Sequence, residues 1–316
     1  MRYAAKLCVL SVAGLALGAM LAAAVVAARP AARPAPPARA GENKAAETRP
    51  ETYPPQALVR ACKAQADALR KRLDETFTVR VDPPFVTAGN MSASRLAAYV
   101  RGSVVRPARA MWDSYFDKKP DKVITVLLFA GDKPYRTWAK KLFNDTDVPY
   151  FGYYTPTSRT LVMNINTGTG TLVHELTHAL IVYDFASVPT WFNEGLASLH
   201  EQCSVGEKLI TGHTNWRLPA LQKAIASKTL RPLGDLVTKR DFYGRLRGIN
   251  YAQARYFVMY MQHLRLLQKF YVHFRSASRT ARTPVDVKAI EHVFGKKLPE
   301  IEEAFIAWVK TLRYRR

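Results

Sequence analysis

The segment from Thr171 to His200, TLVHELTHALIVYDFASVPTWFNEGLASLH, limits the fold of this chain more than any other stretch. A turn rich in glycine and threonine, 167–170, comes directly before it. Apolar residues then recur at three- and four-residue spacing, which predicts a helix packed within a protein core. Those residues are Leu172, Val173, Leu176, Ala179, Leu180 and Ile181. Polar side chains on this helix are therefore expected to lie inside the fold.

Three of these polar residues, His174, Glu175 and His178, form an HExxH pattern. Histidines four residues apart lie about one helical turn apart, so both imidazoles can reach one ion. Zinc accepts neutral imidazole, and a catalytic zinc site has three protein ligands and a water whose pKa falls towards neutrality. Glu175 is placed to take a proton from that water and pass it to a leaving amine. The simpler alternative is a pair of core histidines that only form hydrogen bonds.

The pattern supplies two ligands, so a third must come from nearby. Glu194 stands at the start of what looks like a second helix, from which its carboxylate can turn back to the first. Asp184 lies six residues after His178, where metzincin-type sites place their third ligand. That arrangement needs a turn at position 181, where metzincins have glycine and this chain has the β-branched Ile181. Glu194 is therefore the preferred candidate.

The strings HELTHAL and PTWFNEGLAS together resemble the gluzincin zinc metallopeptidases, in particular the peptidase MA-like branch related to the M1 aminopeptidases. The resemblance implies an α+β fold of thermolysin-like type, with a small mixed-sheet lobe, an HExxH zinc helix and a mainly helical lobe. It implies Zn²⁺ bound by His174, His178 and Glu194, with Glu175 as the catalytic base. A peptide or protein would be the substrate.

The chain departs from the M1 pattern in two places. The connection between His178 and Glu194 is shorter than in those enzymes. The exopeptidase strand GxMEN is missing, because the corresponding segment TLVMNINTG has Met163 and Asn164 but no glutamate. That glutamate holds the free amino terminus of a substrate, so endopeptidase action is slightly favoured over aminopeptidase action.

A further candidate catalytic residue comes from the string NYAQARYFVMYM, which resembles the tyrosine-bearing helix of M1 enzymes. It points to Tyr251 as the hydrogen-bond donor that stabilises the oxyanion formed when water attacks a peptide carbonyl. Tyr243, Tyr256 and His213 remain alternatives.

The amino terminus indicates export. Residues 1–28 contain Arg2 and Lys6 followed by a long uncharged run rich in Ala, Val and Leu, typical of a signal peptide or a membrane anchor. Residues 29–55 are a Pro/Ala-rich stretch that is expected to be a disordered linker. The remaining 56–316 is expected to form one metallopeptidase domain, with an αβ lobe at about 56–185 and a helical lobe at about 186–316. The protein would then be periplasmic or secreted, or anchored by its N-terminal segment.

Hydrophobic periodicity gives a coarse secondary structure. A helix is predicted at Gln56–Asp74, short strands in TVRVDPPFVTAGN, and a helix at Ser92–Phe116 with an interruption near Pro107. A buried strand at Lys122–Ala130, a short helix at Tyr135–Phe143 and a strand pair within Tyr150–Asn166 follow. Later helices are predicted at Leu218–Ser227, Tyr251–Ser276, Pro284–Phe294 and Pro299–Leu312.

The chain is strongly basic, with 47 Lys and Arg against 25 Asp and Glu and a net charge of +22. For an exported protein this favours an anionic cell-envelope polymer or lipid surface as a partner, and no nucleic-acid-binding motif is present. The equally open alternative is a generally basic surface that has no specific partner. Cys62 and Cys203 are candidates for one disulfide if the compartment is oxidising. The sequence thus predicts an exported zinc metallopeptidase. The alternative is a noncatalytic, basic envelope-binding protein with a structural or vestigial metal site.

Overall fold

The computed structural model describes residues 53–314. The predicted signal peptide or anchor, 1–28, and nearly all of the linker, 29–55, lie outside these residues. None of the helices within 53–314 is both long and apolar enough to cross a membrane.

The fold is built on a five-stranded mixed sheet in the order β1-β2-β3-β5-β4. The central strands β2, β3 and β5 are parallel to one another, and an antiparallel edge strand, β1 or β4, lies on each side. Every residue of the three central strands is buried, as expected for strands covered on both faces. The strands are β1 Thr78–Asp82, β2 Phe85–Gly89, β3 Ile124–Phe129, β4 Gly152–Thr155 and β5 Thr160–Asn164. The predicted α+β class is confirmed.

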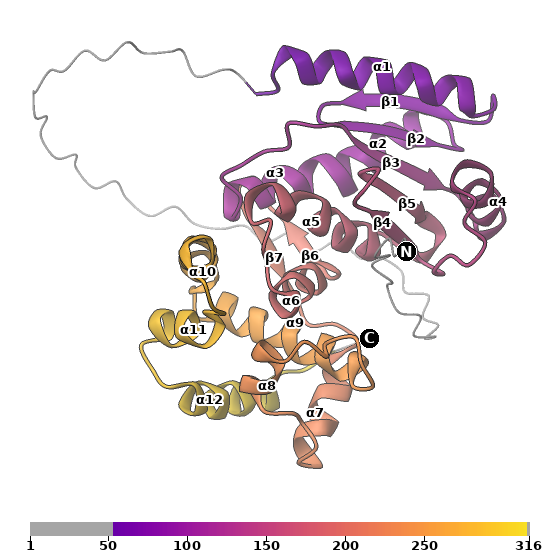
Figure 1. Ribbon diagram of the computed structural model, residues 1–316. Helices are drawn as coiled ribbons and strands as arrows, with labels where there is room; N and C mark the ends of the chain where they lie inside the picture. Colours follow the sequence, from indigo (N-terminus) through magenta and orange to yellow (C-terminus); the bar gives the residue numbers. More distant parts are fainter. Residues whose placement is uncertain (1–52, 315–316) are drawn as a thin grey trace, which may run out of the picture.

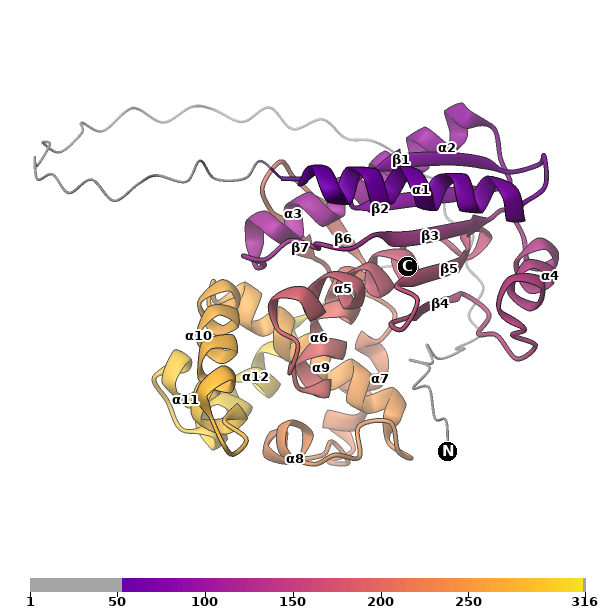
Figure 2. The ribbon, with the colours of Figure 1, turned by 45° about the horizontal axis from the view of Figure 1, so that its top comes forward.

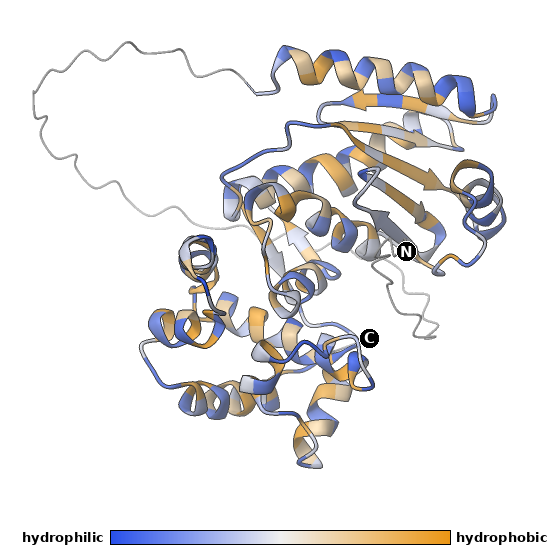
Figure 3. Cartoon of the chain, viewed as in Figure 1, coloured by the Kyte–Doolittle hydropathy of each residue, from blue (hydrophilic) through white to orange (hydrophobic). Residues whose placement is uncertain are grey.

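Alternate residues of each strand enter different hydrophobic clusters. Leu127 and Phe129 of β3 join the cluster under α1 (Gln56–Arg72) and α4 (Asp132–Phe143), whereas Val126 and Leu128 pack towards the opposite face. This two-residue alternation places helices on both sides of the sheet. The opposite face is covered by α2 (Ala93–Val100), α3 (Arg106–Ser114) and α5 (Gly170–Asp184). Figure 3 colours β3 as hydrophobic along almost its whole length.

The second half of the chain is mainly helical. Figures 1 and 2 show α5 and α6 between the sheet and the orange and yellow helices, with α1 at the opposite end of the molecule. One hydrophobic cluster continues from the sheet through α5 and α6 to α12, so it crosses the expected lobe boundary near 185. The elements are α6 Thr190–His200, β6 Cys203–Val205, β7 Ile210–Gly212, α7 Leu218–Ala226, α8 Leu233–Thr238, α9 Arg247–His263, α10 Leu267–Thr280, α11 Asp286–Phe294 and α12 Leu298–Thr311.

Two predicted helices differ from the structure. The single helix predicted at Tyr251–Ser276 is wrong, because α9 ends at His263 and α10 begins at Leu267, with a left-handed residue, Arg265 (φ 59°), between them. The predicted interruption near Pro107 is a π-helical turn, Arg101–Val105, that joins α2 to α3. Proline has no backbone N–H for the regular helical bond, and the wider turn precedes it.

The two candidate disulfide cysteines are both free thiols. Cys62, on α1, is buried in the hydrophobic cluster between α1 and the sheet. Cys203 packs against the other cluster, which lies on the opposite face of the sheet and continues into the helical half. They belong to different parts of the core, so the suggested disulfide does not form.

Helices α6 and α9 approach each other closely at Gly195, the residue that follows Glu194. A Cβ at this position would lie 2.9 Å from both the Ala254 carbonyl oxygen and Val258 Cγ2. The backbone oxygen cannot move aside without shifting a helix. Gly195 is therefore a packing requirement that also sets the position of Glu194.

We expect Gly195→Ala to lower the free energy of unfolding by about 1–3 kcal/mol through overpacking. Gly248→Ala is the matched control, because a Cβ at this helical glycine meets nothing within 4 Å. The control should be neutral or slightly stabilising. Urea unfolding of the two variants measures the difference, and equal stability would contradict the close α6–α9 contact.

Candidate metal centre

Helix α5 carries the HExxH residues into the core, as the apolar spacing predicts. His174 is 1 % exposed, Glu175 0 % and His178 2 %. The helix begins just after Gly168, whose φ of 98° lets the chain turn out of β5 and the short 3-10 helix that follows it. Glu194 arrives from α6, one residue before the close approach at Gly195, and is also fully buried.

Three ligand atoms converge at this point. His174 Nε2 lies 3.1 Å from His178 Nε2, and Glu194 Oε2 lies 3.4 Å and 3.5 Å from these two atoms. In a tetrahedral zinc site with bonds of 2.0–2.1 Å, neighbouring ligand atoms are about 3.3 Å apart. The three atoms are therefore spaced like three corners of a zinc tetrahedron, which leaves the fourth corner for water or substrate. This His174, His178 and Glu194 group is the one set of potential metal ligands found among residues 53–314.

The rival third ligand, Asp184, lies elsewhere. Its Oδ2 accepts a hydrogen bond from Tyr271 (2.8 Å) and forms an ion pair with Arg275, while its Oδ1 accepts from the Lys118 backbone N–H (3.1 Å). Asp184 thus ties the end of α5 to α10. The structure brings Glu194, and not Asp184, to the two histidines.

Acceptor oxygens beside each Nδ1 favour the tautomer of the two imidazoles that a metal requires. His178 Nδ1 donates to Asn193 Oδ1 (2.9 Å), and His174 Nδ1 lies 3.3 Å from Glu201 Oε1, slightly beyond a usual hydrogen bond. A proton on each Nδ1 leaves each Nε2 with its lone pair free. Such partners of metal-binding histidines fix the ring orientation and raise ligand basicity.

Glu201 is itself fixed in position. Arg217 donates to both of its oxygens, at 2.7 Å and 2.9 Å, and Asn215 Nδ2 donates at 3.1 Å. Glu201 follows Glu194 by seven residues, about two helical turns, so both side chains point from one face of α6 and its end. Sequence reasoning did not assign Glu201, although this spacing could have identified it.

The electrostatics favour a positive centre. Burial alone would lower the pKa of His174, but the carboxylates of Glu194 and Glu201 raise it to about 10. Burial would raise the pKa of Glu194, but the two imidazoles hold it well below its usual range. Two carboxylates held in ionised form around two imidazoles provide a site for a divalent cation or for protons.

Glu175 stands apart from this network. Burial raises the pKa of its carboxyl to about 7, and the two histidines oppose that effect. The Tyr154 backbone N–H also lowers this pKa, but neither carboxylate oxygen has a side-chain hydrogen-bond partner within residues 53–314. A buried carboxylate with so few partners is costly and is most often retained for function. It is the group at this site that is free to accept a proton.

The sequence offered four candidates for the donor that stabilises the oxyanion, and two of them, both tyrosines, lie at the site. The Tyr251 ring lies 6.4 Å from the His174 ring, and burial together with the Glu194 carboxylate raises the pKa of Tyr251. Tyr243 donates its hydroxyl to Glu194 Oε1 at 2.6 Å and is 48 % exposed. By contrast, Tyr256 is bound to Asn215 and His213 to Ser204, away from the metal ligands.

The Glu201 network gives a testable expectation. Glu201→Gln should weaken zinc binding by about 10–100-fold, because a neutral amide is a poorer acceptor for the His174 Nδ1 proton. Glu207→Gln, at an exposed position in the β6–β7 turn, is the matched control. Zinc affinity is measured by competition with a chromophoric chelator, on protein whose circular dichroism matches the wild type. Equal affinities in both variants would show that Glu201 does not support the ligand.

A scan against models of protein families finds no match for this chain, and a search of curated proteins finds no similar sequence. Its function is therefore inferred from the residues and geometry of the site.

Proposed function

We propose that the chain is a zinc-dependent metallopeptidase of gluzincin type, in which His174, His178 and Glu194 bind Zn²⁺. The observation that carries this proposal is the triangle of three ligand atoms at zinc-like spacing beside the buried Glu175 carboxylate, whose pKa burial raises to about 7. A purely structural metal site has no need for a buried carboxylate that has no ion pair. That feature disfavours a noncatalytic binding protein.

Zinc at this site would act as a Lewis acid that lowers the pKa of water and polarises a peptide carbonyl. Glu175 takes a proton from the attacking water while the oxygen bonds to the carbonyl carbon, and it then gives that proton to the leaving nitrogen as the C–N bond breaks. The hydroxyl of Tyr251, or that of Tyr243, donates to the oxygen on which negative charge develops. Asn193 and Glu201 keep the two imidazoles in place through these steps.

We propose endopeptidase action in preference to aminopeptidase action. No glutamate stands in β5 or the turn after it, so that segment offers no carboxylate to hold a free amino terminus. Tyr243 is half exposed while its hydroxyl contacts the buried Glu194 carboxylate, so this side chain reaches from the surface to the site. We also propose export, on the basis of residues 1–28, and contact of the basic chain with an anionic envelope polymer or lipid surface.

Removal and return of the metal test the proposal. The chain without residues 1–28, loaded with Zn²⁺, should cleave members of a mixed peptide library. Dialysis against a chelator should abolish cleavage, and one equivalent of Zn²⁺, but not Mg²⁺, should restore it, because imidazole nitrogens suit zinc and Mg²⁺ prefers oxygen ligands. Mass spectrometry of the products measures cleavage and locates the bonds cut. Zinc-loaded protein that cleaves no peptide would reject the peptidase assignment.

A further inference from the structure

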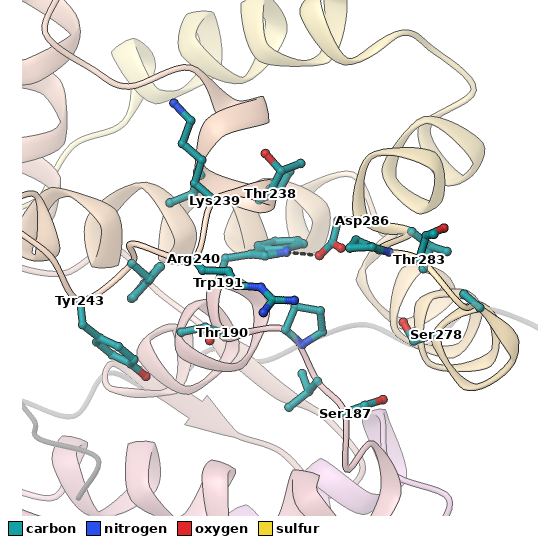
Figure 4. A pocket seen from close by; sticks show the side chains of 18 residues that line it. Ser187, Thr190, Trp191, Thr238, Lys239, Arg240, Tyr243, Ser278, Thr283 and Asp286 are labelled. Atoms are coloured by element: carbon teal, nitrogen blue, oxygen red, sulfur yellow. Dashed lines mark hydrogen bonds between the residues drawn. The ribbon is translucent and has the colours of Figure 1, made fainter. Parts of the chain in front are cut away.

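A pocket of about 440 Å³ lies beside the candidate metal centre. Three segments that are distant in the sequence form it: 187–191 at the start of α6, 236–243 from the end of α8 onwards, and 278–286 from the end of α10 to the start of α11. Figure 4 shows side chains from all three segments surrounding one space. The pocket is large enough for one substrate side chain.

The pocket and the metal centre share a wall. Tyr243 lines the pocket, and its hydroxyl donates to the metal-ligand candidate Glu194 at 2.6 Å. Thr190 and Trp191 line it from the first turn of α6, and Glu194 stands on the next turn, about 5 Å further along the helix axis. A side chain in this pocket would therefore belong to a residue close to the bond being cut.

Arg240 is the one cation of the lining that has no ion pair within residues 53–314. Lys239 forms an ion pair with Asp235 at 2.6 Å, and Figure 4 shows it directed away from the other lining residues. Asp286 is the one carboxylate of the lining. Burial raises the pKa of Asp286, and its Oδ1 accepts a hydrogen bond from Trp191 Nε1 at 2.7 Å. Arg240 has no carboxylate partner among residues 53–314, and its guanidinium lies among the other lining side chains in Figure 4.

The remaining lining suits a short anionic side chain. Hydroxyl groups of Thr190, Ser278 and Thr283 add hydrogen-bond donors, and Val188 and Val237 offer apolar surface for methylene groups. A single guanidinium matches one carboxylate, which it can bind through two parallel hydrogen bonds. A phosphate, with up to two charges, would leave charge uncompensated.

We propose that this pocket is a specificity subsite that binds a glutamate or aspartate side chain of the substrate through Arg240. This inference rests on the proposed peptidase function and adds its substrate class: peptides with an acidic residue near the cleaved bond. Arg240 acts on substrate binding and takes no part in proton transfer.

Matched peptides that carry Glu, Gln or Lys at each position flanking the cleaved bond test the subsite. The zinc-loaded wild type should cleave the Glu peptide at least about tenfold faster in kcat/KM than the Gln peptide at one position, as expected for a charge-assisted pair. The preference should appear mainly in KM. Arg240→Glu should reverse it in favour of Lys. Arg245→Glu, the same charge change at an exposed residue outside the lining, should leave it intact.

Binding to the Glu175→Gln variant separates the two proposals. Calorimetry with the same peptides should show tighter binding of the Glu peptide than of the Gln peptide, and adding Arg240→Gln should remove that difference. Equal binding of the two peptides, or a preference that survives the loss of Arg240, would overturn the subsite. Selective binding without any cleavage by the wild type would reject the peptidase function and support the subsite.

Discussion

A Glu175→Gln variant is expected to lose about 10²- to 10⁴-fold in kcat/KM, the range that general acid–base catalysis contributes. Glutamine has nearly the same shape as glutamate but cannot accept a proton from water. Glu175 is fully buried and forms no ion pair within residues 53–314, and a glutamine oxygen can still accept from the Tyr154 backbone N–H, so the fold should tolerate the replacement. The loss should therefore appear in kcat, with zinc still bound at one ion per chain.

Two measurements test this prediction. Initial rates on a cleaved peptide give the loss of activity, and metal analysis of the same preparation shows whether zinc is retained. Glu75→Gln, at an exposed position before β1, is the matched control and should keep full activity. Unchanged activity in Glu175→Gln would remove the proposed base from the mechanism. Equal inactivity of wild type and variant, with zinc present in both, would favour a binding protein.

Loss of the third ligand should have the other large effect. Glu194→Gln replaces a carboxylate by a weakly coordinating amide. Loss of a residue that only hydrogen-bonds to a metal ligand typically weakens metal binding by roughly 10–100-fold, and we expect the loss of Glu194 to weaken zinc binding more than that. Activity at limiting zinc should fall with it. Within residues 53–314 the ion pairs of Glu194 Oε2 are those with the two imidazoles, so its negative charge is directed at them.

Asp184→Asn is the informative comparison, because Asp184 is the alternative third ligand suggested by sequence spacing. Its change should lower stability, since Arg275 would lose a buried partner, but it should leave the zinc affinity of the folded protein unaltered. Chelator competition and thermal unfolding of both variants distinguish the two roles. A larger loss of zinc affinity in Asp184→Asn than in Glu194→Gln would reverse the ligand assignment.

Local sequence patterns predicted the elements that carry the site. The apolar spacing around His174 and His178 identified a buried helix, and the run before Phe129 identified a fully buried strand. The helix prediction was wrong between α9 and α10. Apolar residues keep a helical spacing on both sides of Arg265, so the spacing gave no sign of the turn at this residue. The β6–β7 hairpin was missed because strands of three residues are too short to show an alternation.

Local sequence patterns also predicted only part of the candidate site. His174, Glu175 and His178 lie within two turns of one helix, so their spacing alone predicted that they share a site. Tyr243 lies in the connection between α8 and α9, 49 residues after Glu194, and only the folded chain shows that its hydroxyl reaches that carboxylate. The guanidinium of Arg217 behind Glu201 is equally remote from any sequence signal. Contacts between loops depend on tertiary packing, which periodicity does not encode.

The most direct test of the central claim is an anomalous difference map, measured at the zinc absorption edge, from crystals of the zinc-loaded chain. We predict one strong peak about 2.0–2.2 Å from His174 Nε2, His178 Nε2 and a carboxylate oxygen of Glu194, with a fourth position open to solvent. A zinc peak elsewhere, or no peak between these three side chains, would contradict the assignment.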